Sequence, residues 1–169
     1  MKELVLGGAR SGKSGYAQQQ ALTGNLQVIY VATATAGDAE MQKRIERHRA
    51  DRPSHWQLIE EPIALASVIT ANASPESCIL VDCLTLWLSN LLAADDEQLM
   101  QNEINQLCEA LPVVQGRLIL VSNETGLGII PMGELTRRYC DEVGLLHQRL
   151  AQLCDHVTFM VAGLPQKLK

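Results

Sequence analysis

The sequence lacks the features that mark a membrane span, a disulfide-stapled chain or a zinc domain. No uninterrupted apolar run reaches membrane-spanning length, and no basic segment followed by an apolar one opens the chain. The five cysteines form no C-x-x-C pair and are odd in number, and no two of the four histidines have H-x-x-x-H spacing. We therefore expect free buried thiols in a reducing compartment, and a cytoplasmic protein without membrane insertion.

Excess positive charge is also missing. The net charge is −5, which argues against nucleic acid or an acidic membrane as the main partner, because binding phosphates there needs clustered cations. Repeats, low-complexity tracts and charged tails are absent, while 47% of the 169 residues are hydrophobic and 20% are charged. These values are ordinary for a globular chain, and we expect one domain over residues 1–169.

The most informative feature present is a G-x-x-x-x-G-K-S motif at residues 7–14. It follows an apolar run and precedes a stretch that can be helical, which is the context of a phosphate-binding loop. Backbone N–H groups and a helix N-terminus would face the phosphates, Lys13 would reach the outer ones, and Ser14 could bind Mg²⁺. This context favours a nucleoside triphosphate site over a glycine-rich turn without a ligand. The predicted phosphate-binding residues are Gly7, Gly8, Ala9, Arg10, Ser11, Gly12, Lys13 and Ser14.

Apolar runs alternate with helical patterns along the rest of the chain. Several runs are continuously apolar, which is typical of strands covered on both faces. The alternation predicts an α/β fold of the P-loop NTPase type, with a mostly parallel sheet and helices on both faces. A break near Ala94, with Asp95 or Asp96 as a cap, divides the longest helical stretch. Strands are expected at 3–7, 27–33, 56–60, 77–82, 117–122 and 156–162, and helices near 13–23, 38–52, 62–73, 84–111 and 133–154.

Ligands of such sheets bind at the carboxyl ends of the strands, so the residues that follow each strand are candidates. Asp82 ends an apolar strand and resembles a Walker B carboxylate that holds Mg²⁺; the alternative is a cap on the next helix. The small residues 32–37 permit close approach of a ligand, although composition alone favours a simple loop. Polar residues 122–124 precede two glycines and the apolar pair Ile129 and Ile130, which indicates a loop that contacts a ligand or another subunit.

Residues 43–52 carry five basic residues around His48, an anomaly in an acidic chain. On a helix, Met41, Ile45 and His48 share a face, so His48 would lie at the margin of the core. One interpretation is a phosphate site with His48 as nucleophile or acid–base group. Spacing alone favours the other, a solvated basic helix with a partly buried histidine.

These blocks together resemble the bifunctional adenosylcobinamide kinase / adenosylcobinamide-phosphate guanylyltransferase family of cobalamin biosynthesis. The resemblance covers nearly the full length. The block from Arg44 to Trp56 and the block from Ser122 to Pro131 make it specific. Position 147 is histidine where the family often has asparagine. The matching residues are 7–14, Arg44-Ile45 through His48-Arg49 to Arg52-Pro53 and Trp56, Glu60-Glu61-Pro62, Ser122-Asn123-Glu124 through Gly126, Gly128 and Pro131, and Asp141, Gly144, 148–151 and Asp155.

The resemblance implies two reactions: phosphorylation of adenosylcobinamide by ATP or GTP, and transfer of GMP from GTP to that phosphate. It implies a GMP–histidine intermediate on His48, which reverses the preference from spacing, with Lys13 as the second catalytic residue. It also implies Mg²⁺ bound by Ser14 and Asp82, and a homo-oligomer, commonly a trimer. The nucleotide-binding residues it implies are 7–14, Ala32, Thr33, Ala34, Arg49, Ala50, Asp51, Arg52, Glu60 and Asp82.

Two other classes of function share the phosphate-binding loop. An ordinary small-molecule kinase or ATPase would use Lys13 and Asp82 without a covalent step, and it has no need of His48. A regulatory nucleotide-binding module would bind GTP without transferring any part of it. Covalent labelling of the protein by α-labelled GTP separates these classes.

Overall fold

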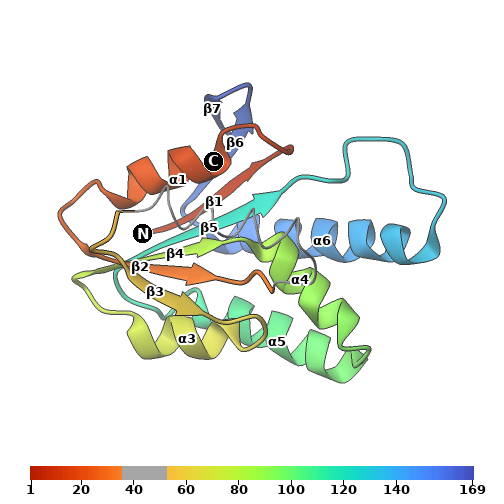
Figure 1. Cartoon of the computed structure of the whole chain (residues 1–169), viewed down its shortest axis with the longest axis horizontal. Coiled ribbons are helices and arrows are strands. Elements are labelled where there is room, and N and C mark those ends of the chain that lie inside the picture. The colour runs from red at the N-terminus through yellow and green to blue at the C-terminus, as the bar shows by residue number, and fades with distance from the viewer. Residues whose placement is uncertain (36–52) are drawn as a thin grey trace.

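A computed structural model describes residues 1–35 and 53–169. The helix expected over 38–52 falls outside these ranges, and so do the predicted site residues His48, Arg49, Ala50, Asp51 and Arg52. The elements alternate along the chain as the apolar pattern predicts (Figure 1). They are β1 (Lys2–Gly7), α1 (Lys13–Ala21), β2 (Gln27–Ala32), β3 (Gln57–Glu60), α3 (Leu65–Asn72), β4 (Ser77–Asp82), α4 (Leu84–Ala93), α5 (Glu97–Ala110), β5 (Arg117–Asn123), α6 (Glu134–Leu153), β6 (His156–Val161) and β7 (Leu164–Lys167).

Within the described residues the strands form one seven-stranded sheet in the order β3-β2-β4-β5-β1-β6-β7. Every neighbouring pair is parallel except β6 and β7. The register brings Ala32 level with both Glu60 and Asp82, while Gly7 lies opposite Asn123. The strand ends that carry the candidate residues therefore meet at one edge, on the right in Figure 1.

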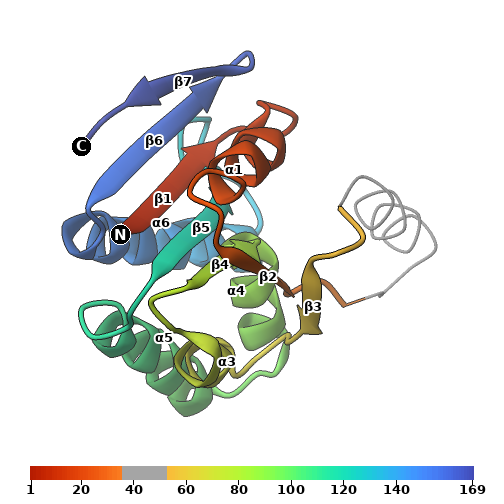
Figure 2. The ribbon, with the colours of Figure 1, turned by 90° about the vertical axis from the view of Figure 1, so that its left-hand side faces the viewer.

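Helices cover both faces of the sheet, as the sequence predicts. Figure 2 shows α1 on one face and α3, α4, α5 and α6 on the other. Under α1, Ala17 and Ala21 are fully buried, and these small side chains let the helix lie close to the strands. The larger cluster on the opposite face contains the buried Trp87 of α4. This two-sided burial accounts for the continuously apolar strands.

Two details differ from the sequence prediction or sharpen it. The break in the stretch 84–111 is confirmed, because Asp95 has a φ of 51° and the Asp96 carboxylate accepts a hydrogen bond from the Leu99 N–H at 2.9 Å. Strand β7 was missed, because its side chains are exposed and include a proline, so no apolar run marks it. No helix in the described parts of the chain is long and apolar enough to cross a membrane.

Candidate functional site

The phosphate-binding loop joins the end of β1 to the start of α1, and its glycines are required by its shape. Gly7 has a φ of 148°, and a Cβ there would lie 2.5 Å from the carbonyl oxygen of Met160. Gly12 has a φ of 97°, and a Cβ there would lie 3.2 Å from Gly163. A side chain at either position would meet backbone atoms of the β6–β7 hairpin, so the motif glycines are structural conditions for the loop.

Lys13 begins α1 and is buried, with only 7% of its surface exposed. Its Nζ donates to the Gly8 carbonyl oxygen at 2.6 Å, which curls the side chain over the loop. Burial lowers the pKa of Lys13, while the neighbouring ionisable groups of Cys83 and Asp82 act in the opposite direction. The first turn of α1 receives no side-chain cap from the described residues, so its N–H groups point into the loop. An anion placed there meets both a cation and a helix N-terminus.

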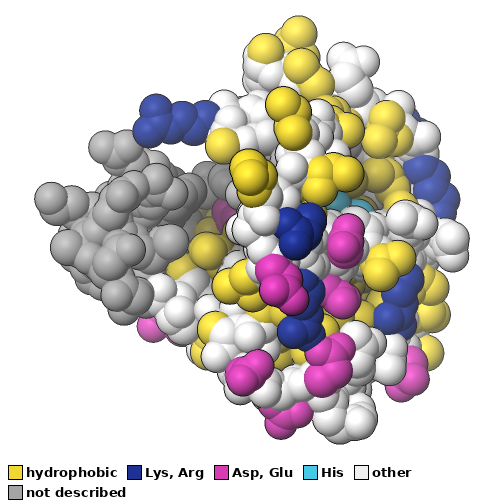
Figure 3. All heavy atoms as spheres, turned by 90° about the vertical axis from the view of Figure 1, so that its right-hand side faces the viewer, with side chains coloured by type: hydrophobic (Ala, Val, Ile, Leu, Met, Phe, Trp, Pro, Cys, Tyr) yellow, Lys and Arg dark blue, Asp and Glu magenta, His cyan; other side chains and the backbone are white. Residues whose placement is uncertain are grey.

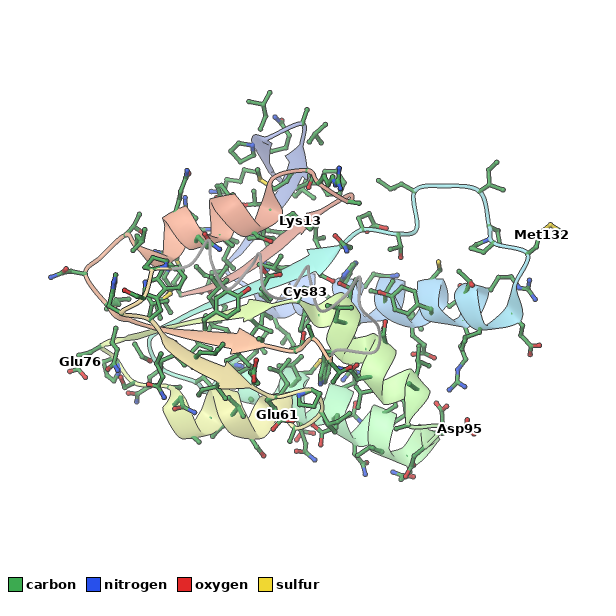
Figure 4. All side chains as sticks on the ribbon, viewed as in Figure 1. Lys13, Glu61, Glu76, Cys83, Asp95 and Met132 are labelled. Carbon is green, nitrogen blue, oxygen red and sulfur yellow. The ribbon has the colours of Figure 1, made fainter. Side chains whose placement is uncertain are left out.

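Asp82 lies at the carboxyl end of β4, two strands away from the loop. Its Oδ2 accepts a hydrogen bond from the Tyr30 hydroxyl at 3.1 Å. The residue at the N-cap of α4 is Cys83, and Asp82 is the last residue of β4, so Asp82 is not the N-cap residue of that helix. Figure 4 shows Lys13 at the first turn of α1 and Cys83 where β4 passes into α4. The carboxylate is thus held at the strand edge by a hydroxyl from β2.

The donor set fits Mg²⁺ in the way nucleotide sites hold it. Ser14 and Asp82 offer oxygen atoms, which hard divalent cations prefer. Within the described residues no group of three metal-binding side chains occurs, so no all-protein metal cage forms there. Mg²⁺ at nucleotide sites takes one or two protein oxygens together with phosphate oxygens and water, and two residues suffice for that.

The neighbouring loops after β2 and β3 also reach this edge. Thr33 is fully buried, and its hydroxyl contacts the backbone of Cys83 rather than pointing outward. Glu60 ends β3 level with Ala32. Glu61, by contrast, accepts hydrogen bonds from the Ile63 and Ala64 N–H groups, both at 2.8 Å, so it holds the chain before α3. Nucleotide contact by Glu60 stays a prediction from the family resemblance.

The loop after β5 carries a buried network that the sequence did not reveal. His147 of α6 forms a hydrogen bond between its Nε2 and the Ser122 hydroxyl at 2.7 Å, and its Nδ1 lies 3.5 Å from Glu124 Oε2. Burial lowers the pKa of His147, and the Glu124 charge opposes that shift. The Glu124 N–H donates to the Gly7 carbonyl oxygen at 2.9 Å, which joins this loop to the phosphate-binding loop.

Beyond Glu124 the same loop presents large apolar side chains to solvent. Figure 3 views the strand-end face, and hydrophobic side chains gather in its upper half, over this loop and the β6–β7 hairpin. Figure 4 places Met132 at the far end of the loop, away from the sheet. The expected role of the loop in contacting a ligand or another subunit stays a prediction. The exposed residues are Leu127, Ile129, Ile130 and Met132 in the loop, and Leu135 in the first turn of α6.

Residues 3–168 match the model of one protein family, described as cobinamide kinase / cobinamide phosphate guanyltransferase. The chain belongs to this family. It is 57% identical to the bifunctional adenosylcobalamin biosynthesis protein CobP of Pseudomonas aeruginosa, over 100% of this chain and 98% of the relative. It is 40% identical to CobU of Salmonella typhimurium and 38% identical to CobU of Escherichia coli, and both alignments cover 100% of this chain and 100% of the relative. Both CobU proteins carry the same description as CobP.

Solved structures of distant proteins share the fold of this family member. The RadB recombinase superposes with a TM-score of 0.54 at 16% identity, over 94% of this chain and 73% of that one. A protein from Pyrococcus horikoshii superposes with a TM-score of 0.60 at 10% identity, over 99% and 85% respectively. At these identities the likeness concerns the fold alone, and it agrees with the predicted P-loop α/β architecture.

The structure thus brings most of the predicted site residues to one edge of the sheet. Residues 7–14, 32–34, Glu60 and Asp82 all lie at or just after the carboxyl ends of strands. Two residues that sequence reasoning missed, His147 and Asn90, come from helices. Asn90 lies within an apolar stretch of α4, and no motif marks it.

Proposed function

We propose that this chain phosphorylates adenosylcobinamide with ATP or GTP and then transfers GMP from GTP to the product. The end products are adenosylcobinamide-GDP and pyrophosphate. The observation that carries the proposal is the buried Lys13 over the N-terminus of α1, with Asp82 at the same end of the sheet on β4, in a chain that matches the family over residues 3–168. This arrangement suits two reactions that both handle the phosphates of a nucleotide.

In the first reaction the chain's own groups hold the triphosphate in place. The hydroxyl oxygen of the aminopropanol arm attacks the γ-phosphorus, the bond from that phosphorus to its bridging oxygen breaks, and the hydroxyl proton leaves to solvent. Lys13 and the N–H groups of the loop face the oxygens on which negative charge grows. When Mg²⁺ is bound by Ser14 and Asp82, it offsets further charge on the phosphates.

In the second reaction the nucleophile we propose is His48. Its neutral imidazole attacks the α-phosphorus of GTP. The bond from that phosphorus to the α–β bridging oxygen breaks, and pyrophosphate leaves. A phosphate oxygen of adenosylcobinamide phosphate then attacks the same phosphorus, and the P–N bond breaks to restore the imidazole. Lys13 would hold the departing pyrophosphate, while Arg49 and Arg52 would offset phosphate charge. His48 lies outside the described residues, so this step rests on the family resemblance and on its chemistry.

We also propose a homo-oligomer, with a trimer as the expected state, in the cytoplasm and with one domain over the whole chain. The exposed apolar loop 127–132 supports an interface with another copy, because a monomer would leave those side chains in water. All five cysteines are unpaired, which agrees with a reducing compartment. Light scattering coupled to size-exclusion chromatography measures the oligomeric state directly.

Product analysis tests the proposed function. The purified protein is incubated with adenosylcobinamide, Mg²⁺ and either ATP or GTP, and the corrinoids are separated and weighed by mass spectrometry. We expect adenosylcobinamide phosphate with either nucleotide and adenosylcobinamide-GDP with GTP alone. Phosphate transfer without any GDP adduct would indicate an ordinary kinase, and GTP binding without either product would indicate a regulatory module.

The His48→Ala variant separates the two reactions in the same assay. It should lose the GDP adduct while phosphorylation largely persists, because the first reaction moves the terminal phosphate directly to a hydroxyl. The matched control is His55→Ala, which changes the only other histidine near that segment. Loss of the GDP adduct in the His55 variant, with parental yield in the His48 variant, would contradict the assignment.

A further inference from the structure

Two side chains connect the three loops that follow β2, β3 and β4. Thr33 lies in the loop after β2, and Asn90 lies one turn before the end of α4. Thr33 reaches the loop after β4, and Asn90 reaches the loops after β2 and β3. Ala34 lies in the first of these loops, and Glu60 and Asp82 are the strand residues just before the other two. The proposed function places all three around the nucleotide and its metal ion.

Asn90 uses both N–H bonds of its amide group in these connections. Its Nδ2 donates to the Thr33 carbonyl oxygen at 2.8 Å and to the Pro62 carbonyl oxygen at 3.1 Å. Its Oδ1 lies 3.2 Å from the Thr35 hydroxyl, which can donate to it. An amide group with all three contacts satisfied holds one orientation, so it fixes the distance between the two loops.

The helix that carries Asn90 is itself fixed. Trp87 lies one turn earlier in α4, is fully buried, and donates from its indole N–H to the Ile63 carbonyl oxygen at 2.7 Å. The contacts of Asn90 and Trp87 therefore attach α4 to the segment between β3 and α3 at two points. Movement of α4 at Asn90 would break hydrogen bonds on both sides.

Thr33 acts on the residue directly after Asp82. Its hydroxyl donates to the Cys83 carbonyl oxygen at 2.6 Å and accepts from the Cys83 N–H at 3.1 Å. Both atoms belong to the backbone that turns from β4 into α4, so one buried hydroxyl fixes that turn. The Tyr30 hydroxyl holds the Asp82 carboxylate itself at 3.1 Å, again from β2.

From these contacts we infer that Thr33 and Asn90 are positioning residues for the metal-bound nucleotide. They act through Asp82 and the neighbouring loops, and their side chains need not touch the nucleotide. The inference rests on the proposed function, since it takes Asp82 as a ligand of Mg²⁺. Residues that orient metal ligands in this way typically contribute about 10–100-fold to metal affinity or activity.

The test compares GTP binding with and without Mg²⁺ by isothermal titration calorimetry, in variants that remove the connections. Thr33→Val keeps the shape and removes the hydroxyl, and Asn90→Leu keeps the size and removes the amide. Thr33→Ser restores a hydroxyl. Asp82→Asn is the positive control, and Thr70→Val is the matched control, because it removes a threonine hydrogen bond confined to α3.

We expect Thr33→Val and Asn90→Leu to lower the Mg²⁺-dependent affinity for GTP by about tenfold, while the metal-free affinity stays within about threefold. Thr33→Ser should recover the parental Mg²⁺ dependence, and Thr70→Val should not change it. Thermal melting identifies any variant that fails to fold. If Asn90→Leu does not fold, Asn90→Gln is used in its place, because it keeps both N–H donors but moves them one methylene further out. If Thr33→Val does not fold, Thr33→Ala is used in its place.

Parental Mg²⁺ dependence in the folded Thr33 and Asn90 variants would overturn the inference. Equal losses of affinity with and without Mg²⁺ would also overturn it, because they would indicate general damage to the fold. If the parent protein itself showed no Mg²⁺-dependent GTP binding, the proposed function would fail and not merely the positioning roles. The two failures are therefore distinguishable in one data set.

Discussion

Buried charged side chains occur at both ends of the parallel strands, and they differ in the groups that surround them. At the amino ends, Glu3 is 4% exposed, and its Oε1 accepts hydrogen bonds from the Tyr16 and Thr158 hydroxyls, both at 3.0 Å. Its Oε2 lies 3.8 Å from Arg117, whose guanidinium also donates to the Gln20 carbonyl oxygen at 2.6 Å. The acidic charge at this end is satisfied by the protein itself.

At the carboxyl ends, Lys13 is buried to a similar degree, yet no acidic side chain among residues 1–35 and 53–169 forms an ion pair with it. Its ammonium group binds the backbone of its own loop, beside a helix N-terminus that no described side chain caps. A hollow of ≈ 400 Å³ nevertheless opens at the amino ends, lined in part by Glu3, Arg117 and His156. The comparison shows that hollow size and buried charge do not by themselves identify a site. The hydrogen-bonding groups that remain available to a ligand at the strand ends identify a site better than hollow size or buried charge does.

The largest effect should follow from Lys13→Ala. Both reactions should fall by about 100-fold or more, because one cation that faces developing phosphate charge is lost. Folding should be retained, since removing a buried ammonium group relieves a desolvation cost. The product assay measures the rates, and circular dichroism measures the fold. Phosphorylation near the parental rate would contradict the role of the loop.

The corresponding change at the amino ends is Glu3→Gln, which should lower stability and leave turnover unchanged. It leaves Arg117 without its buried anionic partner, so the free energy of unfolding should drop by about 1–3 kcal/mol. Turnover of the folded variant should stay near the parental value. Urea unfolding and the product assay check the two halves of this prediction. A large loss of nucleotide affinity in a folded Glu3 variant would erase the distinction between the two ends.

His147 should make stability depend on pH. Burial lowers its pKa below the ordinary value of 6.5, so the unfolded chain binds a proton at a higher pH than the folded one does. Its contribution is therefore fully present above pH 6.5 and declines as the pH falls toward the lower folded pKa, by at most about 1.4 kcal/mol per pH unit. Urea unfolding at pH 7.5 and pH 5.5 should show a smaller difference for His147→Asn than for the parent. Equal pH differences in the two proteins would contradict this.

The smallest effect is expected from the cysteines. Burial raises the pKa of Cys78 to about 11 and the pKa of Cys154 to about 12, so both thiols stay protonated at neutral pH. Iodoacetamide at pH 7.5 should leave them unmodified in the folded protein, and Cys78→Ser and Cys154→Ser should keep parental turnover. Denatured protein, in which all five thiols react, is the control. Rapid native alkylation of Cys78 or Cys154 would disagree with the fold.

The sequence predicted the parts of the molecule that depend on local pattern. Apolar runs located six strands, the pair Asp95 and Asp96 marked the start of α5, and the G-x-x-x-x-G-K-S spacing located the phosphate-binding loop. It did not predict the connections between loops, because those join residues far apart in the chain. Thr33 pairs with Cys83 fifty positions later and with Asn90 fifty-seven positions later, and neither pairing leaves a local signal.

The same limit explains the other misses. His147 reads as one more residue of an amphipathic helix until the fold brings it to Ser122, twenty-five positions away. Strand β7 is exposed, so its only mark is the pairing with β6. In each case the decisive contact is tertiary, and a one-dimensional pattern cannot record it.

Covalent labelling by GTP tests the central claim most directly. The parent protein is incubated with Mg²⁺ and GTP labelled at the α-phosphorus or, separately, at the γ-phosphorus, and labelled peptides are mapped after digestion. The proposed function predicts acid-labile, base-stable label from the α-position alone, on a peptide that contains His48, and much weaker labelling in Lys13→Ala. Label on a peptide with His55 but not His48, or full labelling of His48→Ala, would contradict it.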